Sequence, residues 1–468
     1  MPGARLDSKS MARRAAQEIQ AGQTVAVGSG LPSDVPGAVP AGSGAWFLSE
    51  SGAVGYLPGA GGMLVDGSGS PARAVPGGAV VGVADVAAMV AGGNVGLAFV
   101  EAAQVSASGD FVHWTTAETP GLSAPGFAVD LASGAGRIVA LVRHTGDDGA
   151  PRILEQCSLS IDGNRCVSLI VTDIAAIRVA NNGLELAEVA PGWTSDDIMA
   201  CTAAPLSVAP DLREMTFAVP ALPWPNKVCE SASQALSDVP DGAIVNVDGF
   251  GGPGGMAHYL MTALRDHGAK GLTIISNTAG IARVARFGAP EGVTPIDHTI
   301  LVDNGQVAKA IASYPVSPSI NRPSSFERAY HEGASDLEVS PQGTLAERLR
   351  SGGAGVAGFY TPTAVGTLLG EGKELREIDG RPYVLEQRIL ADFCIIRGHK
   401  ADTLGNMVYR GTSRNFNPVM ATSARVTVVE VDEIVEPGEL DPEEIVTPGV
   451  FVDRIVKRPA DFSPYLDI

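Results

Sequence analysis

The sequence predicts an α/β protein built from two similar three-layer α/β/α lobes, each with helices on both faces of a mostly parallel sheet. The first observation is a faint internal repeat, in which a helix-like stretch, an apolar run and a glycine turn return about 220 positions apart. The second is a set of continuous apolar runs, which are typical of strands covered on both faces. The strands are too frequent for a helix bundle and the helices too long for a β-sandwich, which leaves the layered class.

The elements that open each half occur in the same order. Residues 11–20 have the pattern of a helix and precede Gly22, the apolar run at 24–27 and the glycine turn at 28–32. In the second half, Gly242 holds the place of Gly22, and a run at 243–247 and a turn at 248–255 follow it. Further strands are predicted at 137–142, 272–275 and 426–431.

A boundary between the halves is predicted from clustered prolines. The segment 217–234 contains prolines that can continue neither a helix nor a central strand. We therefore expect a first domain at 1–213, a linker at 214–232 and a second domain at 233–468.

Composition excludes several classes of protein. The 468 residues include 33 Lys and Arg against 52 Asp and Glu, and the net charge of −19 disfavours a nucleic-acid partner. The weakly charged run at 77–100 is interrupted by Asp85, Asn94 and several glycines, which favours buried strands over a membrane span. Five cysteines without paired spacing and a first segment without a secretory signal indicate a cytoplasmic protein with no disulfide framework.

The glycine turn of the second half contains a GxGxxG pattern, formed by Gly249, Gly251 and Gly254. A dinucleotide site would also need an acidic residue at the end of the next strand, where the chain has Ser276 and Asn277 instead. The alternatives are a turn that brings another ligand close to backbone amides at a helix start, or a plain strand-to-helix turn.

A carboxylate stands at the end of the apolar run at 46–49. This residue, Glu50, is followed by small residues, so nothing bulky shields it. A glutamate at a strand end is most often a solvated surface charge, but it can act as a covalent nucleophile where amides stabilise the oxyanion.

Other catalytic motifs are missing from the sequence. The histidines form no HxxxH or HExxH pattern, and the acidic run at 429–444 is expected to be a solvated edge, so no metal site is predicted. No GxSxG sequence occurs, which removes the usual hydrolase nucleophile.

Together these motifs resemble the family I CoA transferases of the 3-oxoacid or 3-oxoadipate type over almost the whole chain. Residues up to 213 are similar to the subunit that carries the nucleophile, through MARRAAQEIQAG, GSGLP, SESGAVG, GDFVHW and VTDIAAI. Residues 233–457 are similar to the other subunit, through DGFGGPGG, LTIISNTAG, SPQGTLAERLRSGGAGVAGFYTPTAVGT and GNMVYRGTSRNFNPVMA. The resemblance implies two fused subunits, with the nucleophile half first and the site in the cleft between the lobes.

The resemblance also implies roles for individual residues. Glu50 is implied to attack an acyl-CoA, giving an acyl-glutamyl anhydride and then a glutamyl-CoA thioester, from which a second carboxylate takes the CoA. CoA is a substrate here, and no cofactor is expected. The oxyanion hole and CoA contacts are implied for Gly28, Gly30, Gly126, Gly249, Phe250, Gly251 and Gly254, and substrate contacts for Asn277, Gln342 and His113.

Several positions depart from the family pattern: Ala26, Ser51 and Thr278 replace asparagines, Asp248 replaces a glycine, and His113 replaces another asparagine. The stretch at 315–325 is longer and richer in proline than the family's acyl-contacting segment. These changes indicate an altered substrate or an altered reaction. His113 and Asp248 are candidates for a new acid or base, and drift on a turn is the alternative.

Three functions follow from these observations. The first is transfer of CoA between an acyl-CoA and a 3-oxoacid-like carboxylic acid by a homo-oligomer, either a dimer or a tetramer. The second is hydrolysis of acyl-CoA, or biosynthetic acyl transfer, through the same anhydride. The third is acyl-CoA binding without catalysis, which an intact Glu50 disfavours.

Overall fold

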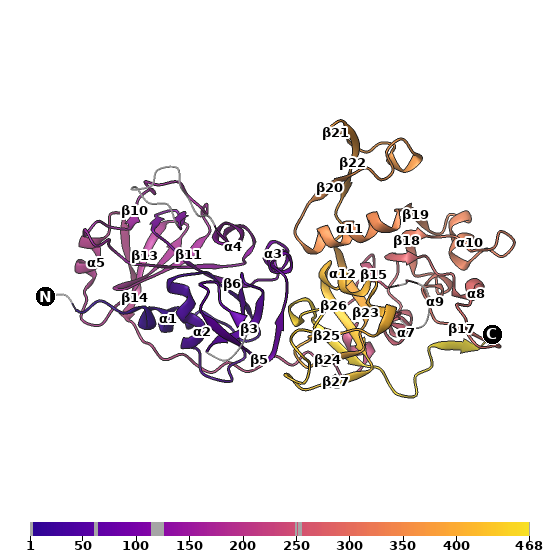
Figure 1. Cartoon of the computed structure of the whole chain (residues 1–468), viewed down its shortest axis with the longest axis horizontal. Helices are drawn as coiled ribbons and strands as arrows, with labels where there is room; N and C mark the ends of the chain where they lie inside the picture. The colour runs from indigo at the N-terminus through magenta and orange to yellow at the C-terminus, as the bar shows by residue number, and fades with distance from the viewer. Residues whose placement is uncertain (1–2, 60–63, 114–125, 249, 251–254, 468) are drawn as a thin grey trace. The chain divides into compact units, whose positions relative to one another are not determined.

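The computed structural model describes residues 3–59, 64–113, 126–248, 250 and 255–467, and the chain divides into two compact units, Met1–Pro225 and Asn226–Ile468. Each unit has its own central sheet (Figure 1). None of the helices in the described part of the chain has the length and apolar character needed to span a membrane.

Unit 1 is built on an eleven-stranded sheet whose five central strands, β11, β9, β6, β1 and β2, run parallel. Antiparallel hairpins extend the sheet on both sides. In spatial order the strands are β14 (Leu206–Glu214), β13 (Gly183–Val189), β12 (Ala175–Ala180), β11 (Val167–Thr172), β9 (Ile138–Val142), β6 (Leu97–Glu101), β1 (Thr24–Val27), β2 (Trp46–Ser49), β3 (Ala53–Pro58), β5 (Pro71–Val80) and β4 (Leu64–Val65).

Both faces of this sheet are covered, as the continuous apolar runs predict. Val25 and Val27 of β1 pack with Met11 of α1 in one buried cluster. Ala26 points to the opposite face and is also fully buried. The helices of the unit are α1 (Ser8–Ala16), α2 (Val35–Ala38), α3 (Val83–Ala91), α4 (Ala128–Gly134) and α5 (Ser195–Cys201), with the 3-10 helix η1 (Leu31–Asp34), and a small sheet contains β10 (Ile153–Leu154), β7 (Gln104–Ser106) and β8 (Phe111–Val112).

Unit 2 has a seven-stranded sheet in which every neighbouring pair is parallel. Parallel pairs need crossover connections, which explains the helices between the strands. In spatial order the strands are β19 (Asp336–Val339), β18 (Val307–Tyr314), β16 (Leu272–Thr278), β15 (Ile244–Val247), β23 (Ala391–Arg397), β26 (Ala424–Val431) and β28 (Arg454–Lys457).

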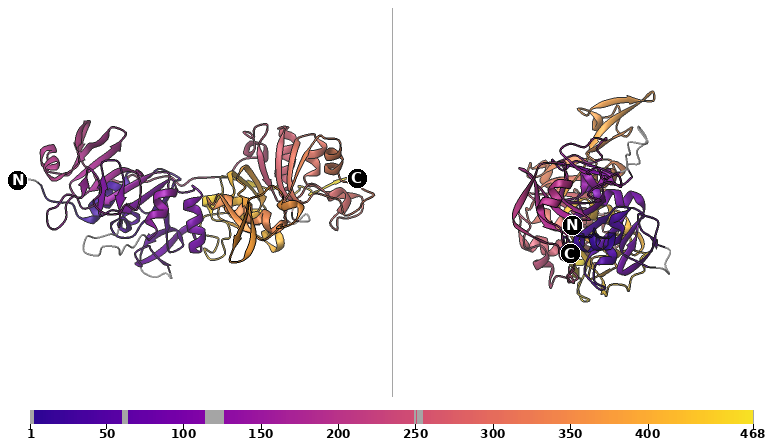
Figure 2. Two further views of the ribbon diagram at one scale, coloured as in Figure 1. Left: turned by 90° about the horizontal axis from the view of Figure 1, so that it is seen from above. Right: turned by 90° about the vertical axis from the view of Figure 1, so that its left-hand side faces the viewer.

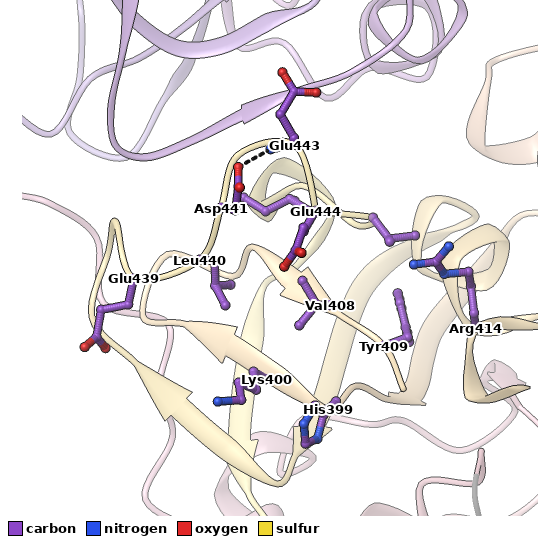
Figure 3. Close-up of a pocket in the computed structure, with 12 residues that line it drawn as sticks. His399, Lys400, Val408, Tyr409, Arg414, Glu439, Leu440, Asp441, Glu443 and Glu444 are labelled. Carbon is purple, nitrogen blue, oxygen red and sulfur yellow. Dashed lines mark hydrogen bonds between the residues drawn. The ribbon is translucent and has the colours of Figure 1, made fainter. Parts of the chain in front are cut away.

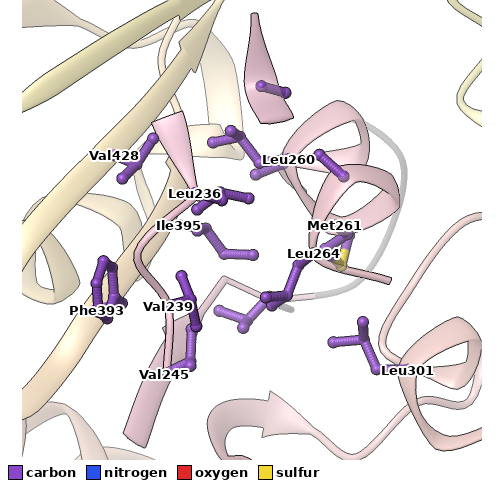
Figure 4. Packing of buried hydrophobic residues seen from close by; sticks show 14 of the residues in the cluster. Leu236, Val239, Val245, Leu260, Met261, Leu264, Leu301, Phe393, Ile395 and Val428 are labelled. Carbon is purple, nitrogen blue, oxygen red and sulfur yellow. The ribbon is translucent and has the colours of Figure 1, made fainter. Parts of the chain in front are cut away.

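Two separate apolar clusters cover the two faces of this sheet, so unit 2 has three layers. On one face, Val245 and Ile395 pack against Leu260 and Met261 of α7 (Figure 4). On the other face, side chains of β16, β23 and β26 pack against Leu345 of α11. The helices are α6 (Ala232–Ala235), α7 (His258–His267), α8 (Ala282–Ala285), α9 (Thr299–Asp303), α10 (Ser325–His331), α11 (Gln342–Gly353) and α12 (Asn417–Thr422). The expected fold class, two α/β lobes with mostly parallel sheets, is confirmed.

The two glycines of the sequence repeat have the same backbone conformation. Gly22 has φ +73° and Gly242 has φ +78°, and a central parallel strand follows each of them. Both lie in the left-handed region that favours glycine. This shared turn is the physical basis of the repeat.

Two expected boundaries differ from the structure. The helix expected at 11–20 is α1, Ser8–Ala16, because the Asp7 side chain caps it by accepting a hydrogen bond from the Ser10 amide at 2.8 Å. The strand expected at 272–275 continues to Thr278, because Ser276 and Thr278 still pair with β18. Asn277 therefore lies within a strand and not after one.

The segment expected to be a linker, 214–232, contains the division between the units but packs against both of them. The Leu222 amide donates to Ser43 Oγ at 2.8 Å in unit 1. The Cys229 amide donates to the Ile455 carbonyl at 2.8 Å in unit 2. Proline here blocks regular structure without making the chain independent of its surroundings.

A three-stranded antiparallel arm of unit 2 stands clear of the other elements of that unit in Figure 1 and in the right-hand view of Figure 2. It contains β20 (Gly358–Thr361), β22 (Arg381–Gln387) and β21 (Leu375–Ile378), with the 3-10 helix η2 (Leu368–Gly370). The remaining elements of the unit are β17 (Val293–Pro295), β29 (Tyr465–Asp467), β24 (Lys400–Asp402), β25 (Met407–Val408), β27 (Glu433–Val435), η3 (Gly411–Arg414) and η4 (Gly449–Phe451).

Candidate functional site

The carboxyl ends of parallel strands bring three segments to one edge of unit 1. Gly28 follows β1, Glu50 follows β2, and Glu101 is the last residue of β6. In open α/β sheets this edge is the usual place for a ligand. Gly28 and Gly30 lie in the turn between β1 and η1, where Gly30 has φ +78°.

A tight hairpin turn fixes the position of Glu50. β2 and β3 pair antiparallel, and the Gly52 amide donates to the Ser49 carbonyl at 3.1 Å, which closes the turn over Glu50. Gly52 has φ +97°, and a Cβ built on it would lie 2.1 Å from the Val81 carbonyl oxygen. Only glycine fits this position, so the glycine of the SESG sequence is a geometric requirement for the turn.

Ser51, where the family pattern has an asparagine, holds a second loop over this turn. Its hydroxyl donates to the Val65 carbonyl at 2.5 Å, so Ser49 is the donor in the 2.8 Å bond between the two serine hydroxyls. The loop then passes Glu50, because a Cβ built on Gly67 would lie 3.3 Å from Glu50 Cγ. Ser68 accepts a hydrogen bond from the Gly30 amide at 3.1 Å, which joins the loop to the turn after β1.

His113 also belongs to this edge. Its Nδ1 lies 2.7 Å from the Glu101 carbonyl oxygen, and because that oxygen only accepts, Nδ1 carries the proton. Its amide donates to Asp162 at 2.6 Å. The residue is therefore held from two sides at the end of β8.

The environment of Glu50 changes its acidity. Partial burial raises the pKa of the Glu50 carboxyl above its ordinary value, while the nearby His113 and a hydrogen bond from the Phe127 amide lower it. Phe127 directly follows Gly126, which has φ +48°. The structure therefore brings Glu50, His113 and the Gly126 turn together, and connects them through Ser68 to Gly30.

In unit 2, two predicted residues line one pocket of about 400 Å³. Phe250 is 42% exposed, and Gln342 is the first residue of α11. The full lining is Phe250, Gln342, Gly343, Ala346, Asn415, Phe416 and Val419. Gly249, Gly251 and Gly254, which were predicted to bind beside Phe250, lie outside the described residues.

Asp248, a departure from the family pattern, anchors this region. It is fully buried, one of its oxygens accepts from the Phe250 amide at 3.2 Å, and the other accepts from Asn417 Nδ2 at 2.7 Å. A buried carboxylate engaged in this way ties the Phe250 amide to Asn417 of α12. These bonds favour a positioning role for Asp248 over the acid or base role considered from the sequence.

Asn277 is placed apart from that pocket. It is buried in β16 and is not among the residues that line the pocket of Phe250 and Gln342. Its substrate contact, which the resemblance implies, stays a prediction.

A second pocket in unit 2, of about 670 Å³, was not predicted from the sequence (Figure 3). Its lining comes from three separate segments at 399–400, 408–414 and 439–446, so no single local pattern signals it. The acidic run expected to be a solvated edge lines part of the pocket with Glu439, Asp441, Glu443 and Glu444, while its first residues belong to the buried strand β26. The His399 ring lies 3.3 Å from the Asp432 carboxylate, and Lys400 is paired with Glu433.

Glu430 of β26 is a fully buried carboxylate that caps α7. It accepts hydrogen bonds from the Tyr259 and Leu260 amides at 2.8 and 3.0 Å, and burial raises its pKa from 4.5 to about 7. The folded state then binds the proton more tightly than the unfolded state, so we expect stability to fall as the pH rises from 4.5 to about 7.

Replacing Glu430 by Gln keeps one acceptor oxygen and removes this titration. Urea unfolding midpoints at pH 5 and pH 8 should therefore differ less in Glu430→Gln than in the parent protein. An unchanged difference between the two midpoints would contradict the assignment.

The comparisons with known proteins agree with this architecture. A family model described as coenzyme A transferase matches residues 8–200 and 229–458. One of the subunits of the 3-oxoadipate CoA-transferase of Pseudomonas putida is 45% identical over 231 residues, which are 49% of this chain and 93% of that protein. The corresponding subunit of the probable succinyl-CoA:3-ketoacid coenzyme A transferase of Bacillus subtilis is 44% identical over 230 residues, 49% of this chain and 89% of that one.

Among solved structures, glutaconate coenzyme A-transferase from Acidaminococcus fermentans aligns with a TM-score of 0.43 and 19% identity, over 50% of this chain and 76% of that chain. No group of three His, Cys, Asp or Glu side chains able to hold a metal ion occurs among the described residues. Because the family model covers both halves, the chain belongs to the coenzyme A transferase family, as the sequence motifs indicated.

Proposed function

We propose that the protein transfers CoA between an acyl-CoA and a carboxylic acid of the 3-oxoacid class, with Glu50 as the covalent carrier. The observation that supports this most directly is the placement of Glu50 on a rigid turn at the carboxyl edge of β2, with the Phe127 amide donating to it. The names of the relatives from Pseudomonas putida and Bacillus subtilis describe this class of reaction. The homo-oligomer, the cytoplasmic location and the lack of a cofactor stay predictions.

The proposed chemistry needs no external base. A Glu50 oxygen attacks the thioester carbon, the C–S bond breaks, and CoA leaves as the thiolate. The thiolate then attacks the Glu50 carbonyl carbon of the anhydride, and the first acid leaves as its carboxylate. The acceptor carboxylate reverses both steps on the glutamyl-CoA thioester and regenerates the Glu50 carboxylate, so no proton is gained or lost.

A trapping experiment tests this proposal. Incubation with acetoacetyl-CoA followed by hydroxylamine should convert Glu50 to a hydroxamate, and peptide mass spectrometry should find the change on that residue. The same treatment without the thioester is the control. A label on another residue, or none at all, would contradict the proposal.

A second candidate function is hydrolysis, or acyl transfer to another nucleophile, through the same anhydride. The specific observation in its favour is His113, a potential base placed close to Glu50 where the family pattern has an asparagine. Release of CoA without any acceptor acid, at a rate that an added acid leaves unchanged, would select this second function.

The pH dependence of acylation should report the environment of Glu50. Only the ionised carboxylate attacks, so the rate should rise as the pH passes through the raised pKa of Glu50. His113→Asn removes a group that lowers this pKa, so its rising limb should lie at higher pH. Single-turnover acylation rates between pH 4 and pH 8 measure the shift, and His331→Asn on the exposed end of α10 is the control.

A further inference from the structure

We propose that Glu101 is a specificity-determining residue, which makes the site favour acyl groups with an uncharged tail over those that carry a second carboxylate. This inference rests on the proposed function, and it narrows the substrate class to monocarboxylic acids. It is carried by the position of Glu101 beside Glu50, by an unpaired oxygen of its side chain, and by the absence of a cationic partner for it among the described residues.

Glu101 and Glu50 leave the sheet of unit 1 at nearly the same level. Val27 of β1 pairs with Ser49 on one side and with Phe99 on the other. Glu50 directly follows Ser49, and Glu101 is two residues beyond Phe99. Only β1 lies between the two strands, so their axes are about 10 Å apart. The two carboxylates therefore belong to one edge of the sheet.

The side chain of Glu101 is fixed over the glycine turn that follows β1. Its Oε2 accepts a hydrogen bond from the Leu31 amide at 3.1 Å. A Cβ built on Gly30 would lie 1.6 Å from the same oxygen, so glycine at this position leaves the room that the carboxylate occupies. The Glu101 carbonyl accepts from His113 Nδ1 at 2.7 Å. Both the backbone and the side chain of Glu101 are thus held in place.

The charge of Glu101 is not neutralised by a neighbour. The Leu31 amide donates to Oε2, and Oε1 accepts no hydrogen bond from a described residue. No described Lys or Arg forms an ion pair with Glu101, and the groups that shift the pKa of Glu50 include neither residue type. Because Glu101 is only partly exposed, salt and water screen its charge less than that of a surface carboxylate.

A second carboxylate on the acyl group would meet this charge without a cationic partner. Like charges at short range disfavour each other, and an unpaired charge that leaves water loses hydration. Acylation removes the charge of Glu50, but Glu101 keeps its charge throughout the reaction. An acyl tail that ends in a methyl group meets no such penalty. The selection therefore acts by repulsion of the wrong substrate.

Butyryl-CoA and succinyl-CoA test this inference, because they differ only in a terminal methyl group or carboxylate. In the full-length protein, the second-order rate constant for acylation should be at least about tenfold higher for butyryl-CoA. Glu101→Gln removes the charge and keeps an acceptor for the Leu31 amide. It should reduce this preference at least about fivefold, mainly through faster acylation by succinyl-CoA. Glu214→Gln removes a charge at the exposed end of β14 and should leave the preference unchanged.

Binding measured without chemistry separates recognition from reaction. In a Glu50→Gln background, calorimetry gives the affinities for the two thioesters. Adding Glu101→Gln should tighten the binding of succinyl-CoA and leave that of butyryl-CoA within about twofold. Circular dichroism confirms the folding of each variant.

The outcomes separate this inference from the proposed function. Equal rates with the two thioesters, or a preference that Glu101→Gln leaves unchanged, overturns the role of Glu101, while a label on Glu50 still supports the function. An equal loss with both thioesters in Glu101→Gln also overturns it and assigns Glu101 a structural role in the turn of Gly30. Tighter succinyl-CoA binding in Glu101→Gln without any label on Glu50 supports the specificity role and contradicts the covalent function.

Discussion

Glu50→Gln should lower CoA transfer by at least about a thousandfold, because a carboxamide oxygen is too weak a nucleophile to form the anhydride. The change is nearly isosteric, and the Phe127 amide donates a hydrogen bond to the Glu50 side chain that the amide oxygen of glutamine still accepts. We therefore expect loss of turnover without loss of folding. Steady-state transfer from acetoacetyl-CoA to an acid, followed by thermal denaturation, measures both quantities.

Glu214→Gln is the matched control for this prediction. Glu214 is an exposed carboxylate at the end of β14 in the same unit. Its replacement should leave turnover unchanged. If Glu50→Gln retained a tenth or more of the parent activity, Glu50 would not be the covalent carrier.

Arg14→Met should destabilise unit 1 by about 1–3 kcal/mol, because the buried carboxylate of Glu188 then keeps only the largely exposed Arg213, which donates to it at 2.6 Å. Arg14 of α1 is 5% exposed and donates to Glu188 at 2.5 and 3.2 Å, and Glu188 is 2% exposed. Arg14 also pairs with Glu18 at 2.8 Å. Since α1 packs on the central sheet, the loss should appear in urea unfolding followed by a probe in this unit.

Arg178→Met is the surface counterpart. Arg178 pairs with Asp211 and Glu185, but its side chain is 43% exposed, and exposed ion pairs contribute only about 0–1 kcal/mol. If Arg178→Met lowered the free energy of unfolding as much as Arg14→Met does, burial would not explain the larger contribution expected from Arg14. Adding Glu188→Leu to Arg14→Met should restore part of the stability, because the buried carboxylate that lost Arg14 is then absent.

Local patterns account for what the sequence predicted well. Gly22 and Gly242 mark the turns before the central strands because a positive φ favours glycine whatever surrounds it. The placement of Glu50 at a strand end follows from an apolar run that stops at a charge. Such signals are contained in a few adjacent residues.

Long-range contacts account for what the sequence could not predict. Asp248 is positioned by Asn417, 169 residues further along the chain, and Ser51 acts through the Val65 carbonyl of another hairpin. The pocket of His399 is assembled from separate segments of unit 2. None of these partners can be identified from spacing alone, because the fold brings them together.

The segment that ties Leu222 to unit 1 and Cys229 to unit 2 also has a consequence for assembly. Where the two halves of a catalyst are separate chains, dilution and unequal synthesis leave some halves without a partner. A covalent connection fixes their ratio at one to one and keeps their effective concentration near the millimolar range typical of short tethers. Dilution to nanomolar concentration cannot separate these two halves, so we expect no loss of specific activity from that cause.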